Sequence, residues 1–301
     1  MISKQASFKL PSPLEKVQHP LFSSKNIEVF IKRDDLIHLV VSGNKWRKLK
    51  YNFEAFSSSG KSGIITLGGA YSNHLVASAE ACWQRDIPLL AIVRGEEASN
   101  PSLDFCRSKG MKPHFISRDE YRHIRSNGLP ANLIEIYGDL HFIPEGGSNV
   151  EGIRGCQEIL SEVEEHFDLV FCPIGSGTTL SGLISGPKRA EIVGVSSLKG
   201  GFMEKEIEQM LSKYNLAQVN PWSVLNDFHF GGFAKVTQDL VDFTRNFKQA
   251  AGIQLDYIYT AKMVFGMFEM LRKGGIPQGS KLLLIHTGGL QGNASFESRF
   301  D

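Results

Sequence analysis

Long apolar runs are missing from this sequence, and no stretch approaches the roughly 20 residues that a membrane span needs. The charges lack an excess of one sign, with 33 Lys and Arg against 32 Asp and Glu, and no basic stripe offers a surface for nucleic-acid phosphates. The four cysteines, Cys82, Cys106, Cys156 and Cys172, form no C-x-x-C pair that would indicate a metal or a redox dithiol. We therefore expect no membrane and no nucleic-acid partner, and reduced, buried thiols in a cytoplasmic protein.

Several enzyme signatures are also missing. Neither H-E-x-x-H nor G-x-S-x-G occurs, which argues against metalloprotease and serine-hydrolase chemistry. The glycine-rich loop within 172–182 lacks the lysine of a Walker A loop and the spacing of the dinucleotide fingerprint, so it does not indicate ATP or NAD. Residues 1–10 contain two lysines and no apolar core, so we do not expect a signal peptide.

Short, continuously apolar runs that end in glycines alternate with helical stretches. Such runs are typical of parallel strands covered on both faces, so the chain is predicted to be an α/β protein. We predict a small domain at 51–145 inserted into a larger one of 1–50 and 146–301, with 144–149 as a linker and ligand between the domains. The predicted strands are 27–31, 63–67, 88–93, 168–172, 191–195 and 281–285, and the predicted helices are 44–56, 74–85, 103–109, 152–166 and 180–185.

Lys45 differs from the lysines around it. It follows Gly43-Asn44, where a loop passes into a helix, so its amine projects from the start of that helix. A helix N-terminus disfavours a cation, which lowers the pKa of an amine and favours the neutral, nucleophilic form that a Schiff-base lysine needs. The alternative is a solvated helix face, which accounts for most lysines in such a segment.

Polar residues follow the predicted strand at 63–67. Ser72, Asn73 and His74 come after two glycines and lead into a helix. A helix cap explains one of them, and His74 is equally consistent with a structural histidine. Three consecutive polar side chains at the carboxyl end of a strand, where open α/β sheets bind ligands, indicate a site for a small carboxylate.

A second strand runs into a polar loop, Gly175-Ser176-Gly177-Thr178-Thr179, and then into a helix. Its amides and hydroxyls are suited to hold one phosphate monoester at the helix N-terminus, although a tight turn alone also explains a single loop of this kind. Further along, Tyr259 and Thr260 open a helix rich in Met and Phe, and Thr287 follows a strand at a Gly-Gly turn.

Together these segments resemble the 1-aminocyclopropane-1-carboxylate (ACC) deaminase/D-cysteine desulfhydrase family of pyridoxal-phosphate (PLP) enzymes. The resemblance runs from about residue 32 to residue 289, and its motifs are Lys32-Arg33-Asp34-Asp35, Gly43-Asn44-Lys45-Trp46-Arg47-Lys48-Leu49 and Ser72-Asn73-His74. It implies the tryptophan-synthase-β-like fold, PLP fold type II, with two open, mainly parallel twisted sheets and flanking helices. It also implies pyridoxal 5'-phosphate as the cofactor, a small amino acid as the substrate, and a homodimer.

The resemblance implies a role for each candidate residue. Lys45 would form the Schiff base with PLP and Asn73 would contact the phenolic oxygen of the cofactor ring. Ser72 and His74 would face the substrate carboxylate, and Tyr259 would lie beside cofactor and substrate as a catalytic or stacking residue. The implied catalytic residues are Lys45, Tyr259 and Ser72, and the implied cofactor-binding residues are Lys45, Asn73, Gly175, Ser176, Gly177, Thr178, Thr179, Thr260 and Thr287. The implied substrate-binding residues are Ser72, Asn73, His74 and Tyr259.

Two positions bear on which branch of the family the chain resembles. ACC deaminases usually carry Glu after the catalytic Tyr, at the pyridine nitrogen, and Leu in the H-T-G-G segment, whereas desulfhydrases usually carry Thr at both, as Thr260 and Thr287 do here. ACC has no Cα hydrogen, so opening its ring demands a pyridinium that a carboxylate holds better than a hydroxyl. We therefore expect β-elimination from D-cysteine to pyruvate, sulfide and ammonia, with deamination of ACC to 2-oxobutanoate and ammonia as the alternative.

Other readings stay open at this point. A serine/threonine dehydratase, a β-replacing synthase or a racemase shares the fold, but its lysine usually has a different local sequence. A protein that binds PLP without turnover is the non-enzymatic alternative. The aromatic residue of the family's Y-G segment appears here as Phe230-Gly231, which removes one hydroxyl, and the chain is compact between Asp35 and Gly43; both features bear on the substrate pocket.

Overall fold

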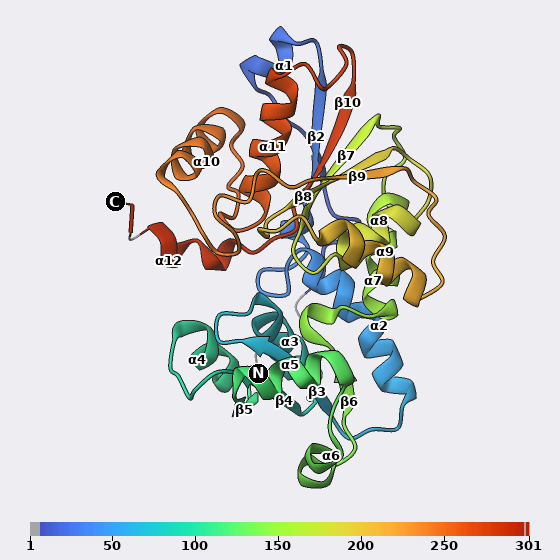
Figure 1. The fold of residues 1–301 in the computed structure, drawn as a ribbon, viewed down its shortest axis with the longest axis vertical. Coiled ribbons are helices and arrows are strands. Elements are labelled where there is room, and N and C mark those ends of the chain that lie inside the picture. The colour runs from blue at the N-terminus through green and yellow to red at the C-terminus, as the bar shows by residue number, and fades with distance from the viewer. Residues whose placement is uncertain (1–6, 298, 301) are drawn as a thin grey trace. The chain divides into compact units, whose positions relative to one another are not determined.

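The computed structural model describes residues 7–297, 299 and 300, so most of the segment in which we expect no signal peptide, residues 1–6, lies outside the described residues. Contacts divide the described chain into two compact units (Figure 1). The smaller unit holds residues 7–8, 38–41 and 45–155, and the larger unit holds 9–37, 42–44 and the described part of 156–301. The smaller unit thus extends at both ends beyond the 51–145 that we expect from the sequence.

The smaller unit is built on a four-stranded parallel sheet in the order β5-β4-β3-β6. Its strands are β3 (Ile64–Gly69), β4 (Leu89–Arg94), β5 (Lys112–Ile116) and β6 (His141–Ile143), and its helices include α3 (Asn73–Trp83), α4 (Pro101–Ser108), α5 (Arg118–Asn127) and α6 (Ala131–Tyr137). Residues of α5 and α6 pack on β3 and β4 through Tyr121, Ile124 and Leu133. Most of α2 (Asn44–Ser58) also belongs to this unit.

The larger unit contains a six-stranded sheet in the order β1-β2-β10-β7-β8-β9, parallel except for β1. Its strands are β1 (Leu14–Lys16), β2 (Glu28–Lys32), β7 (Leu169–Ile174), β8 (Glu191–Ser196), β9 (Trp222–Leu225) and β10 (Lys281–Ile285). Because β2, β10, β7 and β8 are parallel neighbours, their carboxyl ends lie along one edge of the sheet.

Helices cover both faces of the larger sheet, as Figure 1 shows, with α10 and α11 on one side and α8 and α9 on the other. One buried cluster joins Ile31 and Val195 to Met263 and Phe268 of α11, and another joins Ile192 and Leu283 to residues of α7, α8 and α9. The helices are α1 (Pro20–Ser24), α7 (Val150–Ser161, shared with the smaller unit), α8 (Thr178–Ser185), α9 (Met203–Lys213), α10 (Gln238–Ala251), α11 (Thr260–Arg272) and α12 (Ala294–Glu297).

The predicted fold class is confirmed, with two open, mainly parallel sheets and flanking helices. All six predicted strands and all five predicted helices are present, with ends shifted by a few residues. The sequence reading missed β1, β5, β6 and β9, which are short or only half-buried and therefore lack a continuous apolar run. Among the described residues, no helix combines the length and the apolar character needed to cross a membrane.

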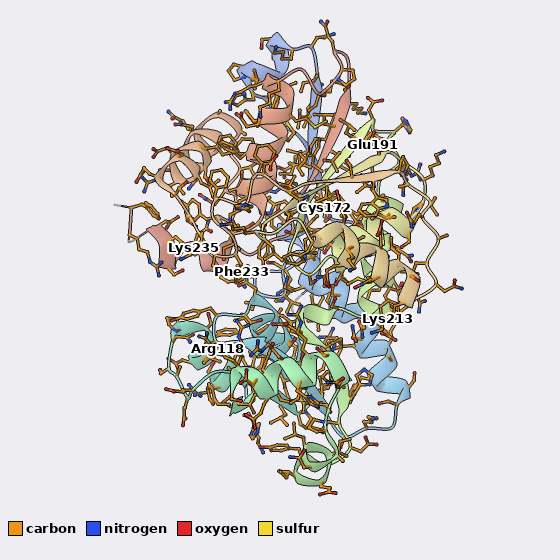
Figure 2. All side chains as sticks on the ribbon, viewed as in Figure 1. Arg118, Cys172, Glu191, Lys213, Phe233 and Lys235 are labelled. Atoms are coloured by element: carbon orange, nitrogen blue, oxygen red, sulfur yellow. The ribbon has the colours of Figure 1, made fainter. Side chains whose placement is uncertain are left out.

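The expected linker at 144–149 is wrong, because this segment is packed. It contains the short 3-10 helix Glu145–Gly147. The side-chain amides of Asn52 and Asn149 donate hydrogen bonds to each other's carbonyl oxygens at 3.1 and 2.7 Å, which ties the segment to α2. The four cysteines, all among the described residues, are buried, as expected, and form no disulfide; Cys172 lies inside β7 (Figure 2).

Candidate active site

In the larger unit, the residue before Lys45 is fixed to the end of β10. The backbone amide of Asn44 donates to the carbonyl oxygen of Thr287 at 3.2 Å, and its side-chain amide donates to Oγ1 of Thr179 at 3.0 Å. Gly43 lies so close that a β-carbon there would be 1.9 Å from the Thr287 oxygen, and its φ is +63°. Only glycine satisfies both conditions, so the Gly-Asn pair sets the start of the helix on which Lys45 is the next residue.

The polar loop after β7 ends in an open helix start. Gly177 is the N-cap of α8, with φ +82°, and no side chain caps the first turn. A helix start without a side-chain cap is the arrangement in which first-turn amides bind an anion. The hydroxyls of Ser176 and Thr178 lie 3.0 Å apart at this loop. Since Oγ1 of Thr179 accepts a proton from Asn44, its own proton is free to donate elsewhere.

The ring of Tyr259 lies against this loop. A β-carbon on Gly175 would be 2.9 Å from Cε1 of Tyr259 and 3.4 Å from its hydroxyl oxygen. Glycine therefore permits the close approach of the ring to the loop. The ring of Phe233 is 6.1 Å from that of Tyr259, and its residue is 54% exposed in the segment between β9 and α10 (Figure 2).

Phe233 is a neighbour of Tyr259 that sequence reasoning missed. Phe230, which stands for the family's hydroxyl-bearing aromatic in our expectation, packs its ring 4.9 Å from that of Phe265 in the apolar cluster on the α11 face of the sheet. The loop bends sharply here, because Phe230 has φ +53° and Gly231 has φ +95°. Lys262, which is buried, donates to the carbonyl oxygens of His229 and Gly232 at 2.9 Å and holds this bend.

Thr260 follows Tyr259 at the start of α11 and is fully buried. Its hydroxyl donates to Oδ2 of Asp256, and its backbone amide donates to the same oxygen at 2.8 Å. Oδ1 of Asp256 accepts from the amides of Ile258 and Tyr259 at 3.1 and 2.7 Å. Asp256 therefore binds the backbone amides that lead into α11, whose N-cap residue is Tyr259. Sequence reasoning missed Asp256, because it lies four residues before the helix and not at the N-cap position.

In the smaller unit, Ser72, Asn73 and His74 form a turn, called the S-N-H turn below, that follows the carboxyl end of β3. Ser72 is the N-cap of α3, and its Oγ accepts from the amides of His74 and Leu75 at 3.2 and 3.4 Å. The capping alternative thus applies to Ser72, whose own proton is left to donate outward. The side chain of Asn73 is half-buried and makes no hydrogen bond to any residue that the structure describes. Its amide therefore remains available to a ligand.

The sequence predicts that His74 faces a substrate carboxylate, but its ring lies inside the smaller unit and is 2% exposed. Thr66 donates its hydroxyl proton to the carbonyl oxygen of Ile143, so Nε2 of His74, 2.8 Å from Oγ1 of Thr66, must supply the proton between them. Burial, with smaller contributions from the charges of Lys45 and Lys48, lowers the pKa of His74 to about 3. A neutral ring whose proton is used internally offers no charge to a carboxylate.

The effect of Lys45 on the pKa of His74 indicates that Lys45 lies near the S-N-H turn. Lys45 is half-buried near the start of α2, and its ammonium charge acts on the ring of His74. A β-carbon on Gly147 would lie 3.0 Å from Cβ of Lys48 and 3.8 Å from Cε1 of His74. The start of α2 and the S-N-H turn, far apart in sequence, thus come together within the smaller unit.

These residues fit pyridoxal phosphate. The start of α8 offers amides and hydroxyls to a phosphate, and glycine at 175 lets the ring of Tyr259 lie against the same loop. Lys45 offers an amine, and the half-buried Asn73 offers an amide. The phosphate, the ring and the aldehyde of the cofactor each have a candidate partner.

Comparison with known proteins agrees with this chemistry. A family model described as "Pyridoxal-phosphate dependent enzyme" matches residues 9–288. A Thermotoga maritima protein named, provisionally, as a 1-aminocyclopropane-1-carboxylate deaminase is 31% identical, with 94% of this chain and 95% of the relative covered. A bifunctional D-cysteine desulfhydrase/1-aminocyclopropane-1-carboxylate deaminase from Arabidopsis thaliana is 30% identical, with 94% and 77% covered.

A solved structure supports the same relationship. The crystal structure of an ACC deaminase homologue superimposes with a TM-score of 0.83 at 25% identity, covering 98% of this chain and 94% of the other. The match extends over nearly the whole of both chains, so the resemblance in the motifs is accompanied by the same fold. The chain therefore belongs to the family of pyridoxal-phosphate-dependent lyases and deaminases that includes ACC deaminase and D-cysteine desulfhydrase.

Proposed function

We propose that the chain cleaves a small amino acid with PLP linked to Lys45, and that D-cysteine is its preferred substrate. The observation that carries the proposal is the placement of Lys45. It directly follows Asn44, which is bonded to Thr287 and Thr179, and its charge reaches the S-N-H turn. A reactive amine, a phosphate-suited loop and a carboxylate-suited turn are the three parts that a PLP enzyme of amino acids requires.

Each candidate residue has a binding role in this proposal. The first-turn amides of α8, with Ser176, Thr178 and Thr179, hold the phosphate, and Tyr259 and Asn73 contact the ring. Ser72 donates its hydroxyl proton to the substrate carboxylate. Thr260 would face the ring nitrogen and Thr287 would line the cofactor, as the resemblance implies. His74 acts indirectly, because its bond to Thr66 supports the turn that presents Ser72 and Asn73.

Lys45 performs the proton transfer. When bound, the cofactor supplies an aldehyde that links to an amine and a ring that accepts the electrons released at Cα. Once the substrate amine has replaced that of Lys45, the neutral Lys45 amine removes the Cα proton. In D-cysteine the thiolate then leaves Cβ, and water completes the conversion of D-cysteine to pyruvate, hydrogen sulfide and ammonia. The ring of Tyr259, which lies beside the loop at Gly175, excludes water from the reacting face of the substrate.

ACC deamination is the second candidate, favoured by the names of both relatives above. ACC and water would yield 2-oxobutanoate and ammonia. Because ACC lacks a Cα proton, its reaction begins with opening of the ring and depends on a strongly electron-accepting cofactor. Thr260 and Thr287, in place of the Glu and Leu usual in deaminases, favour the elimination reaction instead.

The substrate is tested by assaying the PLP-loaded protein with D-cysteine and ACC side by side. Pyruvate with sulfide from D-cysteine, and no 2-oxobutanoate from ACC, is the expected result. Release of 2-oxobutanoate from ACC alone would overturn the choice of D-cysteine while leaving the family reaction intact. Release of no keto acid from these or other small amino acids would favour a PLP-binding protein without turnover.

The lysine is tested by comparing Lys45→Ala with Lys50→Ala, a matched change five residues further along α2. Lys50 lies with its amine 4.9 Å from the centre of the Tyr51 ring. The Lys45 variant is expected to lose about 10²- to 10⁴-fold in kcat while the phosphate loop still binds cofactor, and the Lys50 variant to keep its activity. Unchanged turnover in Lys45→Ala would contradict the assignment. The homodimer implied by the family stays a prediction, which sedimentation tests.

A further inference from the structure

The strongest unassigned feature of the site is the carboxylate of Asp256, which is buried at the start of α11 with an exposure of 2%. It receives four hydrogen bonds, three from backbone amides and one from the hydroxyl of Thr260. The positive end of the helix lies at this carboxylate. Burial lowers the pKa of the nearby Lys262 to about 8, and the charge of Asp256 opposes that shift. Asp256 is therefore an anion held in a fixed orientation.

The anion determines which way the Thr260 hydroxyl points. An ionised carboxylate has no proton to give, so the hydroxyl of Thr260 must donate to Oδ2 of Asp256. The proton of that hydroxyl is thereby committed. The oxygen of Thr260 can offer only lone pairs to any further partner, and it acts as an acceptor.

We propose that Asp256 is a positioning residue that keeps the ring nitrogen of the bound cofactor protonated by acting through Thr260. A hydroxyl that only accepts forms a hydrogen bond with an N–H and has none to give to a bare pyridine nitrogen. The pair therefore stabilises the pyridinium form. The carboxylate that deaminases of the family place directly at the nitrogen is here one hydroxyl further away.

This inference rests on the proposed placement of Thr260 at the ring nitrogen, and it has a consequence for substrate choice. A lone threonine cannot hold a proton on the ring nitrogen, which is why Thr260 favours elimination over ring opening. A threonine oriented by Asp256 retains part of the effect of a carboxylate. The cofactor bound beside Thr260 and Asp256 should therefore accept electrons more strongly than a cofactor bound beside a threonine without such a partner.

Asp256→Asn is predicted to reverse the hydrogen bond. Two amides, of Ile258 and Tyr259, face Oδ1, and only the backbone amide of Thr260 faces Oδ2. The asparagine therefore keeps its carbonyl oxygen toward the two amides, turns its side-chain amide toward Thr260 and gives up the bond from the Thr260 backbone amide. The Thr260 oxygen must then accept from that amide, and its released proton points outward. Thr260 becomes a donor, which favours the unprotonated ring nitrogen.

The test is the ¹⁵N resonance of the ring nitrogen in protein loaded with ¹⁵N-labelled PLP. The wild-type protein and Thr260→Ser, which keeps the hydroxyl, should both show the pyridinium position. Asp256→Asn and Thr260→Val should both shift to the position of neutral pyridine. Thr260→Val removes the hydroxyl and leaves the three backbone amide bonds to Asp256 in place, so it gives the same readout if Asp256→Asn does not fold.

The matched control is Asp239→Asn, the same substitution in the exposed first turn of α10, and it should leave the resonance unchanged. A neutral pyridine signal in the wild-type protein, or a pyridinium signal that persists in Asp256→Asn or Thr260→Val, would overturn the assignment of Asp256 while leaving the proposed function standing. A wild-type protein that takes up no PLP would overturn the proposed function, and this inference with it.

Discussion

The carbonyl oxygen of Thr287 accepts a hydrogen bond from the backbone amide of Asn44 at 3.2 Å, and the same oxygen would lie 1.9 Å from a β-carbon on Gly43. The end of strand β10 and the start of α2 are thus in direct backbone contact. Because Lys45 is the next residue, the position of its main chain is determined by this contact and not by its own side chain. Glycine at 43 is a structural requirement of the site.

Gly43→Ala is expected to displace the start of α2 and to impair cofactor loading. The overlap with Thr287 should reduce the free energy of unfolding by about 1–3 kcal/mol, in addition to about 1 kcal/mol for an alanine at positive φ. Gly60→Ala is the control, because Gly60 has φ +69° and nothing within 4 Å of its β-position. Urea unfolding that gives equal losses for the two variants would show that the contact with Thr287 is unimportant.

Gly175→Ala is expected to lower kcat/KM more than stability. The added methyl would meet the Tyr259 ring at 2.9 Å, and moving a catalytic or stacking group by a fraction of an ångström can cost about 10- to 100-fold in rate. Gly292→Ala, where nothing lies within 4 Å, should leave kinetics unchanged. A Gly175 variant with normal kinetics would mean that Tyr259 does not depend on this loop.

His74 should make the protein sensitive to acid. An unfolded histidine binds a proton below its ordinary pKa of 6.5, whereas the folded one stays neutral down to about 3. The unfolded state therefore binds more protons in this window, so the stability that the neutral His74 provides is complete above pH 6.5 and is lost as the pH falls. Each pH unit inside the window costs up to about 1.4 kcal/mol.

The comparison that isolates this effect is the wild-type protein against His74→Gln. The difference in their free energies of unfolding should shrink by about 2 kcal/mol between about pH 7 and about pH 5, because glutamine does not titrate. His123→Gln, at an exposed position on α5, serves as the control and should track the wild type. If His74→Gln also tracks the wild type across this range, the buried ring is not neutral in the folded protein.

The fold was largely predictable because its central strands are continuously apolar and end in glycine loops, as in the runs that become β3, β7 and β10. The strands that escaped prediction, such as β5 and β9, are half-buried, and their residues carry no such signal. The segment at 144–149 has the composition of a linker. Its packing depends on Asn52, which is distant in sequence.

The site was predictable as a set of loops but not in the orientation of its side chains. Motif spacing indicates Lys45 and the polar turns, yet whether His74 faces outward depends on Thr66 and Ile143, two residues on neighbouring strands. The place of Phe233 beside Tyr259 depends on a bend at Phe230, whose φ is positive. The sequence does not predict this bend, because a phenylalanine rarely adopts a positive φ. Tertiary contacts decide such orientations, and local sequence does not encode them.

The central claim, that Lys45 is the lysine that carries the cofactor, is tested most directly by reducing the PLP-loaded protein with borohydride, digesting it and sequencing the labelled peptide by mass spectrometry. Reduction fixes the cofactor to the lysine that held it. The account predicts a single modified lysine, Lys45, in the segment Gly43-Asn44-Lys45-Trp46. Cofactor found on Lys48, on another lysine, or on none would contradict it.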